Sequence, residues 1–141
     1  MEKNARIYVA GHTGLVGSAI VRKLRGEGYN NLVLRTHAEL DLTDQQAVKT
    51  FYRETNPEYV LDAAALVGGI RANNAAPADF FYVNMQIENN LIWGAHEAGV
   101  KKLLFLGSAC MYPKECEQPM CEEEVLTGLP EYTNEGYALA K

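Results

Sequence analysis

The chain has 141 residues, of which 48% are hydrophobic and 22% charged, and its formal net charge is −5 at pH 7. The length suits one domain, and the composition is ordinary for a globular core. The acidic balance argues against a nucleic-acid partner, which needs a basic face. No apolar stretch approaches the roughly 20 residues that span a bilayer. Residues 1–6 are charged and lack the apolar segment of a signal peptide, so we expect a cytoplasmic protein.

Strand and helix patterns alternate along the whole chain. The expected strands are residues 5–10, 31–35, 59–64 and 102–107. The expected helices are residues 14–26, residues 43–54, a long helix from Pro77 to Gly99 and a last helix from about Asn134, with loop over residues 113–133. This alternation predicts an α/β fold, a doubly wound parallel sheet with right-handed crossovers, over residues 1–141. The almost wholly apolar strand 102–107 is typical of a strand buried on both faces.

A glycine motif follows the first expected strand directly. Gly11 permits a tight turn, Gly14 lets a phosphate approach the backbone, and Gly17 allows the next helix to pack closely on the strand. Such a turn presents backbone N–H groups and a helix N-terminus to a pyrophosphate. We therefore expect a dinucleotide phosphate site lined by Gly11, His12, Thr13, Gly14, Leu15, Val16 and Gly17.

The residues after the second expected strand are candidates for the adenosine end of that dinucleotide. They are Arg35 and His37, followed by Asp41 and Leu42. An NAD site commonly has an acid at this strand end, whereas Arg35 and His37 favour a 2′-phosphate. NADP (NADPH) is therefore the predicted cofactor, and a solvated strand end is the alternative.

The third expected strand ends in small residues. Ala63, Ala64 and Ala65 allow the chain to pass close to a nicotinamide ribose. The following Gly68 and Gly69 fit a flexible turn equally well.

Three residues near the end of the chain form a possible acid–base set. Tyr137 and Lys141 are four residues apart, which places them on one face of a helix. An ammonium group stabilises a neighbouring phenolate, which suits Tyr137 to proton transfer near neutral pH. Ser108, after the fourth strand, is expected to donate a hydrogen bond to a substrate carbonyl. Such a Tyr/Lys pair alone is often coincidental, but its position after four strand–helix units favours catalysis.

The three cysteines, Cys110, Cys116 and Cys121, lie in one short stretch. An odd number without a signal peptide indicates reduced thiols, and without a CxxC pair we predict no metal site. Cys110 follows Ser108 by two residues, so on an extended backbone both side chains point the same way. The thiol would then lie beside the carbonyl-binding hydroxyl, although a buried cysteine is also a common apolar filler.

These motifs resemble the extended short-chain dehydrogenase/reductase family along essentially the whole chain. The matching segments are residues 10–18, 63–70, 73–80, 84–90, 104–114 and 133–141, and the segment with Ser108 and Cys110 is the most specific. The likeness is to members that epimerise GDP-4-keto-6-deoxy-mannose at C3″ and C5″ and then reduce it at C4″ with NADPH.

The resemblance implies a role for each candidate residue. Ser108, Tyr137 and Lys141 match the reductase triad, with Lys141 also holding the nicotinamide ribose, and Cys110 matches the acid/base of epimerisation. Family members often carry arginine at the positions of Thr13 and His37, so here Arg35 and a protonated His37 are the expected partners of a 2′-phosphate.

Family chains are a little over twice as long as this one. The resemblance therefore implies the N-terminal, cofactor-binding part of a homodimeric enzyme, with little turnover by itself. The later strands, the histidine partner of Cys110 and the domain that holds the GDP-sugar would lie outside these residues. Another nucleotide-sugar epimerase or reductase and a non-catalytic dinucleotide-binding module are the alternatives.

Overall fold

The computed structural model describes residues 1–141, and its internal contacts divide the chain into two compact units. The sheet unit comprises residues 1–65 and 86–106. The helical unit comprises residues 66–85 and 107–141. The long helix α4 (Pro77–Glu97) contributes its first part to the helical unit and its second part to the sheet unit.

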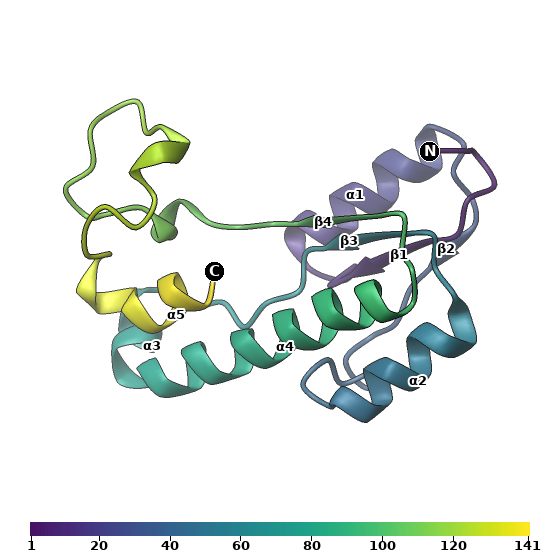
Figure 1. Ribbon diagram of the computed structural model, residues 1–141, viewed down its shortest axis with the longest axis horizontal. Helices are drawn as coiled ribbons and strands as arrows, with labels where there is room; N and C mark the ends of the chain where they lie inside the picture. The colour runs from purple at the N-terminus through teal and green to yellow at the C-terminus, as the bar shows by residue number, and fades with distance from the viewer. The chain divides into compact units, whose positions relative to one another are not determined.

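The sheet unit contains one parallel sheet with strand order β2-β1-β3-β4 (Figure 1). Its strands are β1 (Ile7–Ala10), β2 (Leu32–Val33), β3 (Tyr59–Asp62) and β4 (Lys102–Phe105). Ala10 lies opposite Asp62, and Asp62 lies opposite Phe105, so three strands end at one level. The strand order reverses beside β1, and ligands of such sheets bind at the carboxyl ends near that point.

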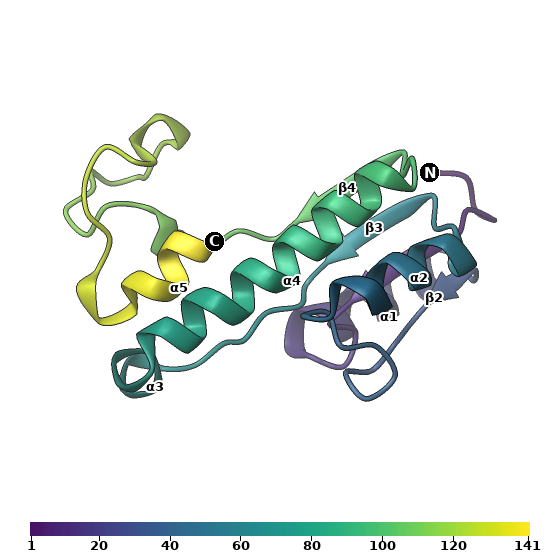
Figure 2. The same cartoon turned by 60° about the horizontal axis from the view of Figure 1, so that its bottom comes forward.

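Helices cover both faces of this sheet, which confirms the doubly wound α/β prediction. Helix α1 (Leu15–Gly26) lies on one face, while α2 (Gln45–Thr55) and the second part of α4 lie on the other (Figures 1 and 2). Successive residues of β1 point to opposite faces of the sheet and pack against different helices. Ile7 and Val9 pack with the apolar residues of α1, whereas the ring of Tyr8 lies 4.5 Å from that of Phe51 on α2.

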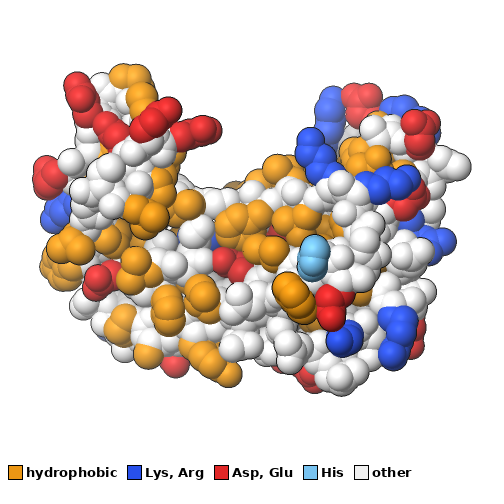
Figure 3. Space-filling view, viewed as in Figure 1, with side chains coloured by type: hydrophobic (Ala, Val, Ile, Leu, Met, Phe, Trp, Pro, Cys, Tyr) orange, Lys and Arg blue, Asp and Glu red, His pale blue; other side chains and the backbone are white.

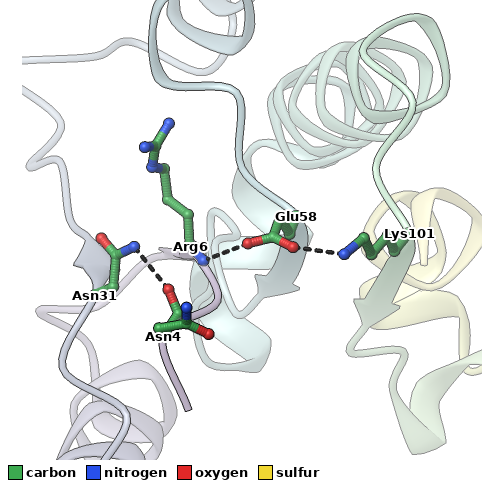
Figure 4. A network of polar contacts seen from close by, with 5 residues as sticks. All are labelled: Asn4, Arg6, Asn31, Glu58 and Lys101. Atoms are coloured by element: carbon green, nitrogen blue, oxygen red, sulfur yellow. Dashed lines mark hydrogen bonds and ion pairs between the residues drawn. The ribbon is translucent and has the colours of Figure 1, made fainter. Parts of the chain in front are cut away.

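A polar network joins the amino ends of the strands, at the opposite end of the sheet from the glycine turn (Figure 4). One oxygen of Glu58 accepts a hydrogen bond of 3.0 Å from the backbone N–H of Arg6, and the other contacts Lys101 Nζ at 2.5 Å. The Lys101 ammonium, followed by the Arg6 N–H, lowers the pKa of Glu58. Asn31 donates a hydrogen bond of 3.0 Å to the carbonyl of Asn4. Glu58 thus fixes the starts of three strands.

The expected burial of the fourth strand is wrong. β4 is the edge of the sheet, and Leu104 is 48% exposed. Leu104 lies opposite Leu61 in register. The apolar cluster beneath α1 includes Leu61 but not Leu104, so it reaches β3 and goes no further. The apolar composition of β4 therefore indicates a strand but does not decide whether a helix covers it.

The helical unit contains short elements around the first part of α4. They are α3 (Ile70–Ala75), the 3₁₀ turns η1 (Ala109–Met111), η2 (Glu122–Glu124) and η3 (Tyr132–Asn134), and α5 (Glu135–Ala140). The predicted last helix is confirmed as α5, while α3 and η1 were not expected. η3 packs against α3 and α5, and η1 packs against α5.

Acidic side chains are concentrated on one loop of the helical unit. Exposed acids, among them Glu115, Glu117, Glu122 and Glu123, cluster on the loop that carries η2 (Figure 3, upper left). None of the helices is both long and apolar enough to span a membrane.

Candidate functional site

The glycine turn of the sheet unit is tightly enclosed by backbone. Gly11 has φ +70°, and a Cβ there would lie 2.5 Å from the carbonyl oxygen of Ala63. Gly17 is buried, and a Cβ there would lie 2.1 Å from the carbonyl oxygen of Gly11. Both positions therefore exclude any side chain, which is the close approach expected for a dinucleotide-binding turn.

The start of α1 is open at this turn. Gly14 is the N-cap of the helix, no side chain caps it, and its first turn carries no acidic residue. Thr13, Gly14, Leu15 and Val16 are all exposed. Because the first N–H groups of a helix have no intrahelical partner, this end can accept an anion. His12 differs from its neighbours, since its Nδ1 is buried and has no hydrogen-bond partner.

The residues after β2 expose both signs of charge. Arg35, His37 and Asp41 are exposed, and one N–H of Arg35 donates to the carbonyl of Leu34 at 2.9 Å. Glu39, which was not predicted, accepts hydrogen bonds from the Thr36 N–H at 2.7 Å and the Thr36 hydroxyl at 2.8 Å. These bonds hold the pKa of Glu39 below its usual value.

Asp41 and Leu42 are anchored differently from each other. Asp41 accepts from the hydroxyl and the N–H of Thr43, and these bonds lower the pKa of its carboxyl. The side chain of Leu42 is buried, and its carbonyl accepts from Asn90 at 2.9 Å. Leu42 can thus offer a ligand only its backbone.

The alanines after β3 lie beside the glycine turn. The N–H of Ala63 donates to the carbonyl of Ala10 at 3.2 Å, and the N–H of Ala64 donates to the buried carboxyl of Asp62 at 3.0 Å. Ala63, Ala64 and Ala65 are half-buried. A surface hollow of the sheet unit, about 170 Å³ in volume and lined by residues of α2 and α4, contains none of the predicted site residues.

In the helical unit, Ser108 begins a turn rather than continuing a strand. Its hydroxyl accepts a hydrogen bond of 3.2 Å from the Cys110 N–H, and its own N–H contacts the sulfur of Met111 at 3.3 Å. The extended geometry expected for residues 108–110 is therefore wrong, because the Ser108 side chain caps η1. Ser108 and Cys110 are held together by this cap instead of by strand alternation.

Cys110 contacts the segment that carries the predicted tyrosine. Asn134 Nδ2 lies 3.0 Å from Cys110 Sγ, and α5 begins at the next residue. At the C-terminal end of α5 the N–H of Lys141 donates to the carbonyl of Tyr137 at 3.1 Å, so the two residues are one helical turn apart as expected. Both are half-buried.

Gly136 brings α5 close to the first turn of α4. A Cβ at Gly136 would lie 2.3 Å from the carbonyl oxygen of Pro77. The helix that carries Tyr137 can therefore pack in this position only without a side chain at residue 136. The sequence analysis missed this residue, although a glycine inside an expected helix is a signal for close packing.

Asn84 is a second residue that sequence reasoning missed. It is completely buried, its Oδ1 accepts from the Leu66 N–H at 2.8 Å, and its Nδ2 donates to the carbonyls of Leu66 at 3.0 Å and Phe80 at 2.7 Å. An amide can pair with both backbone groups of one residue in the way a neighbouring strand does. Asn84 thereby fixes the chain just beyond Ala65.

Known proteins match this chain along its full length. A model of the NAD dependent epimerase/dehydratase family matches residues 7–141. The putative GDP-L-fucose synthase 2 of Arabidopsis thaliana is 62% identical over 141 residues, which is 100% of this chain and 43% of that protein. GDP-L-fucose synthase of Escherichia coli is 56% identical over 136 residues, which is 96% of this chain and 42% of that protein.

A solved structure has the same fold. MlghC, a GDP-mannoheptose C4 reductase from Campylobacter jejuni with NADP bound, has a TM-score of 0.97 at 47% identity, covering 100% of this chain and 45% of that one. The chain thus spans less than half the length of these relatives. The resemblance predicted from the motifs is confirmed, and the chain belongs to the NAD dependent epimerase/dehydratase family.

Proposed function

We propose that this chain is the N-terminal, cofactor-binding part of GDP-L-fucose synthase. That enzyme converts GDP-4-dehydro-6-deoxy-D-mannose to GDP-L-fucose by 3,5-epimerisation and NADPH-dependent 4-reduction. The observation that carries the proposal is the cluster in the helical unit, where η1 with Ser108 and Cys110 packs against α5 with Tyr137. The identity to GDP-L-fucose synthases supports it.

The sheet unit fits a dinucleotide at the glycine turn. The backbone from Gly11 to Gly17 and the uncapped start of α1 would hold the pyrophosphate, because no side chain fills that space. Arg35 and His37 would face a 2′-phosphate, and Ala63 to Ala65 leave room for the nicotinamide ribose. NADPH, when bound, supplies the hydride for the reduction at C4″.

The helical unit supplies the acid–base groups in this proposal. Ser108 and Tyr137 donate hydrogen bonds to the C4″ oxygen, which stabilises negative charge on it in both steps. Cys110, in its thiolate form, takes a proton from carbon beside the ketone: the C–H bond breaks, its electron pair moves onto the oxygen, and an S–H bond forms. The enolate then regains a proton on the opposite face of the same carbon, which completes the epimerisation. Tyr137 protonates the C4″ oxygen during reduction, and the Lys141 ammonium favours the resulting phenolate.

A GDP-sugar C4 reductase with another substrate is the second candidate. The 47% identity to the Campylobacter jejuni GDP-mannoheptose C4 reductase favours it. Such an enzyme would reduce its own keto sugar and leave GDP-4-dehydro-6-deoxy-D-mannose unchanged. By family resemblance we also propose that the whole enzyme is a cytoplasmic homodimer without nucleic-acid or membrane partners.

The cofactor assignment is tested by titrating the chain with NADPH and, separately, with NADH while nicotinamide fluorescence is recorded. We expect saturable binding that favours NADPH, because Arg35 and His37 can attract the 2′-phosphate. A preference for NADH would overturn the NADP assignment but would still support a dinucleotide site at the glycine turn. Absence of binding to either would contradict a dinucleotide site formed by these residues alone.

The epimerase assignment is tested with Cys110→Ser in the full-length enzyme. We expect epimerisation, followed as deuterium uptake from D₂O at C3″ and C5″, to fall by about 10²-fold or more, the usual contribution of a general acid/base. Reduction of the already epimerised keto sugar should change much less. Equal losses in both steps would remove Cys110 from this role.

A further inference from the structure

Cys110 receives a hydrogen bond from a residue far away in the sequence. Asn134 Nδ2 lies 3.0 Å from Cys110 Sγ across 24 positions, within the helical unit. Both residues are half-buried. The cap on η1 and the packing of η1 against α5 hold the two side chains together.

Asn134 makes this contact in place of the hydrogen bond that an asparagine at the start of a helix usually makes. It is the N-cap of α5, where an asparagine oxygen ordinarily accepts from the N–H groups of the first helical turn. Here the side chain makes no cap hydrogen bond. Its Oδ1 is buried and has no hydrogen-bond partner. A buried oxygen without a partner costs stability. The Asn134 amide thus leaves its oxygen unpaired and keeps the hydrogen bond that its N–H donates to sulfur.

We infer that Asn134 is a positioning residue for Cys110, which holds its sulfur in place by donating a hydrogen bond to it. An N–H donor interacts more strongly with an anionic sulfur than with a neutral thiol, and so favours the charged form. The thiolate is the species that can remove a proton from carbon. The consequence for epimerisation rests on the function proposed above, whereas the effect on the thiol itself does not.

The position of Asn134 also couples two groups of the proposed chemistry. It precedes Tyr137 by three residues at the start of the same helix. A shift of α5 would therefore move the proposed proton donor and the partner of the thiol together. This coupling suits a site in which one sugar must meet both groups.

The test is the rate of iodoacetamide alkylation of Cys110 between pH 5.5 and 10 in the intact chain. Trypsin releases Cys110 in the peptide 103–114 and leaves Cys116 and Cys121 in the peptide 115–141, so mass spectrometry distinguishes Cys110 from the other two thiols. Asn134→Leu removes the donor and keeps most of the volume. Asn134→Asp keeps the shape and places a carboxylate beside the sulfur.

We expect Asn134→Leu to make alkylation of Cys110 about tenfold slower at neutral pH, because the sulfur loses its N–H donor. Asn134→Asp should slow the alkylation further, because a carboxylate repels a thiolate. Asn74→Leu, an exposed asparagine on α3 in the same unit, is the matched control and should leave the profile unchanged.

An unchanged Cys110 profile in both Asn134 variants would overturn the inference. If Asn134→Leu fails to fold, as judged by far-ultraviolet circular dichroism, Asn134→Ala decides the question, because it also removes the N–H donor without adding a charge. The result is independent of the proposed function. A shifted profile together with normal epimerisation by full-length Cys110→Ser would keep this inference and reject the epimerase role of Cys110.

Discussion

At the residue scale, Gly11 combines a positive φ with a close backbone contact, so it should not tolerate a side chain. Gly11→Ala would place a Cβ 2.5 Å from the Ala63 oxygen at a φ of +70°, so we expect a loss of about 3 kcal/mol of stability. NADPH binding should be lost with it. Urea unfolding of Gly11→Ala and of the control variant Gly26→Ala measures the effect. Gly26 ends α1 with no atom within 4 Å of a new Cβ, so that change should stabilise by up to about 1 kcal/mol. Equal stabilities would contradict the enclosed turn.

Also at the residue scale, the Cys116 thiol should react slowly. Its hydrogen bond to Glu124, followed by burial and the negative charge of that carboxylate, raises its pKa to about 11. Because the reactive thiolate appears only as the pH approaches that value, alkylation of Cys116 should rise about tenfold per pH unit from pH 7 to 10. Glu124→Gln removes the charge and should accelerate the reaction at pH 8 by about tenfold. A rate that levels off near pH 8 in the unmodified protein would show that the thiol is not held neutral.

At the element scale, the packing of α5 against α4 depends on Gly136. Gly136→Ala would bring a Cβ within 2.3 Å of the Pro77 oxygen and force α5 away from the first turn of α4. We expect a loss of about 2 kcal/mol, which is typical of overpacking, and a changed near-ultraviolet signal from Tyr137 and its neighbours. Gly69→Ala, in the same unit with open space around the new Cβ, serves as the comparison. Similar unfolding midpoints for the two variants would show that α5 does not need this close approach.

At the scale of the whole molecule, we expect the exposed apolar edge of the sheet in this chain to favour self-association. β4 pairs only with β3, and Leu104 is 48% exposed. An unpaired apolar edge is a template for pairing with a second chain. We expect Leu104→Lys to lower light scattering of concentrated solutions several-fold and to change stability by less than about 1 kcal/mol.

The control for that prediction is Leu129→Lys, which alters an exposed loop residue away from any strand. It should leave scattering almost unchanged. If both lysine substitutions reduce scattering equally, the effect is one of net charge and the edge of the sheet is not responsible.

Most of the fold was predictable because its signals are local. Runs of apolar residues, the cap at Asp44 and the glycine motif each specify an element from neighbouring residues. Element ends were less predictable, since β2 has two residues where five were expected. The short helix α3 was missed because a six-residue helix carries too little periodicity to stand out.

The candidate acid–base residues can be named from the sequence, and their roles stay a prediction, but the contacts that these residues make could not be predicted. Ser108, Cys110, Tyr137 and Lys141 were all recognised from spacing and resemblance. The turn at η1 replaced the expected strand, because a serine side chain can satisfy the backbone locally in place of a sheet.

The α/β alternation, the glycine turn and the family can be predicted from the amino-acid order, because these depend on spacing along the chain. The contact of Asn134 with Cys110, the close approach of Gly136 to Pro77 and the exposure of Leu104 become visible in the folded chain alone. Each of these contacts or exposures depends on which segments pack together. Such contacts join residues that are distant in sequence, so a local sequence pattern cannot predict them.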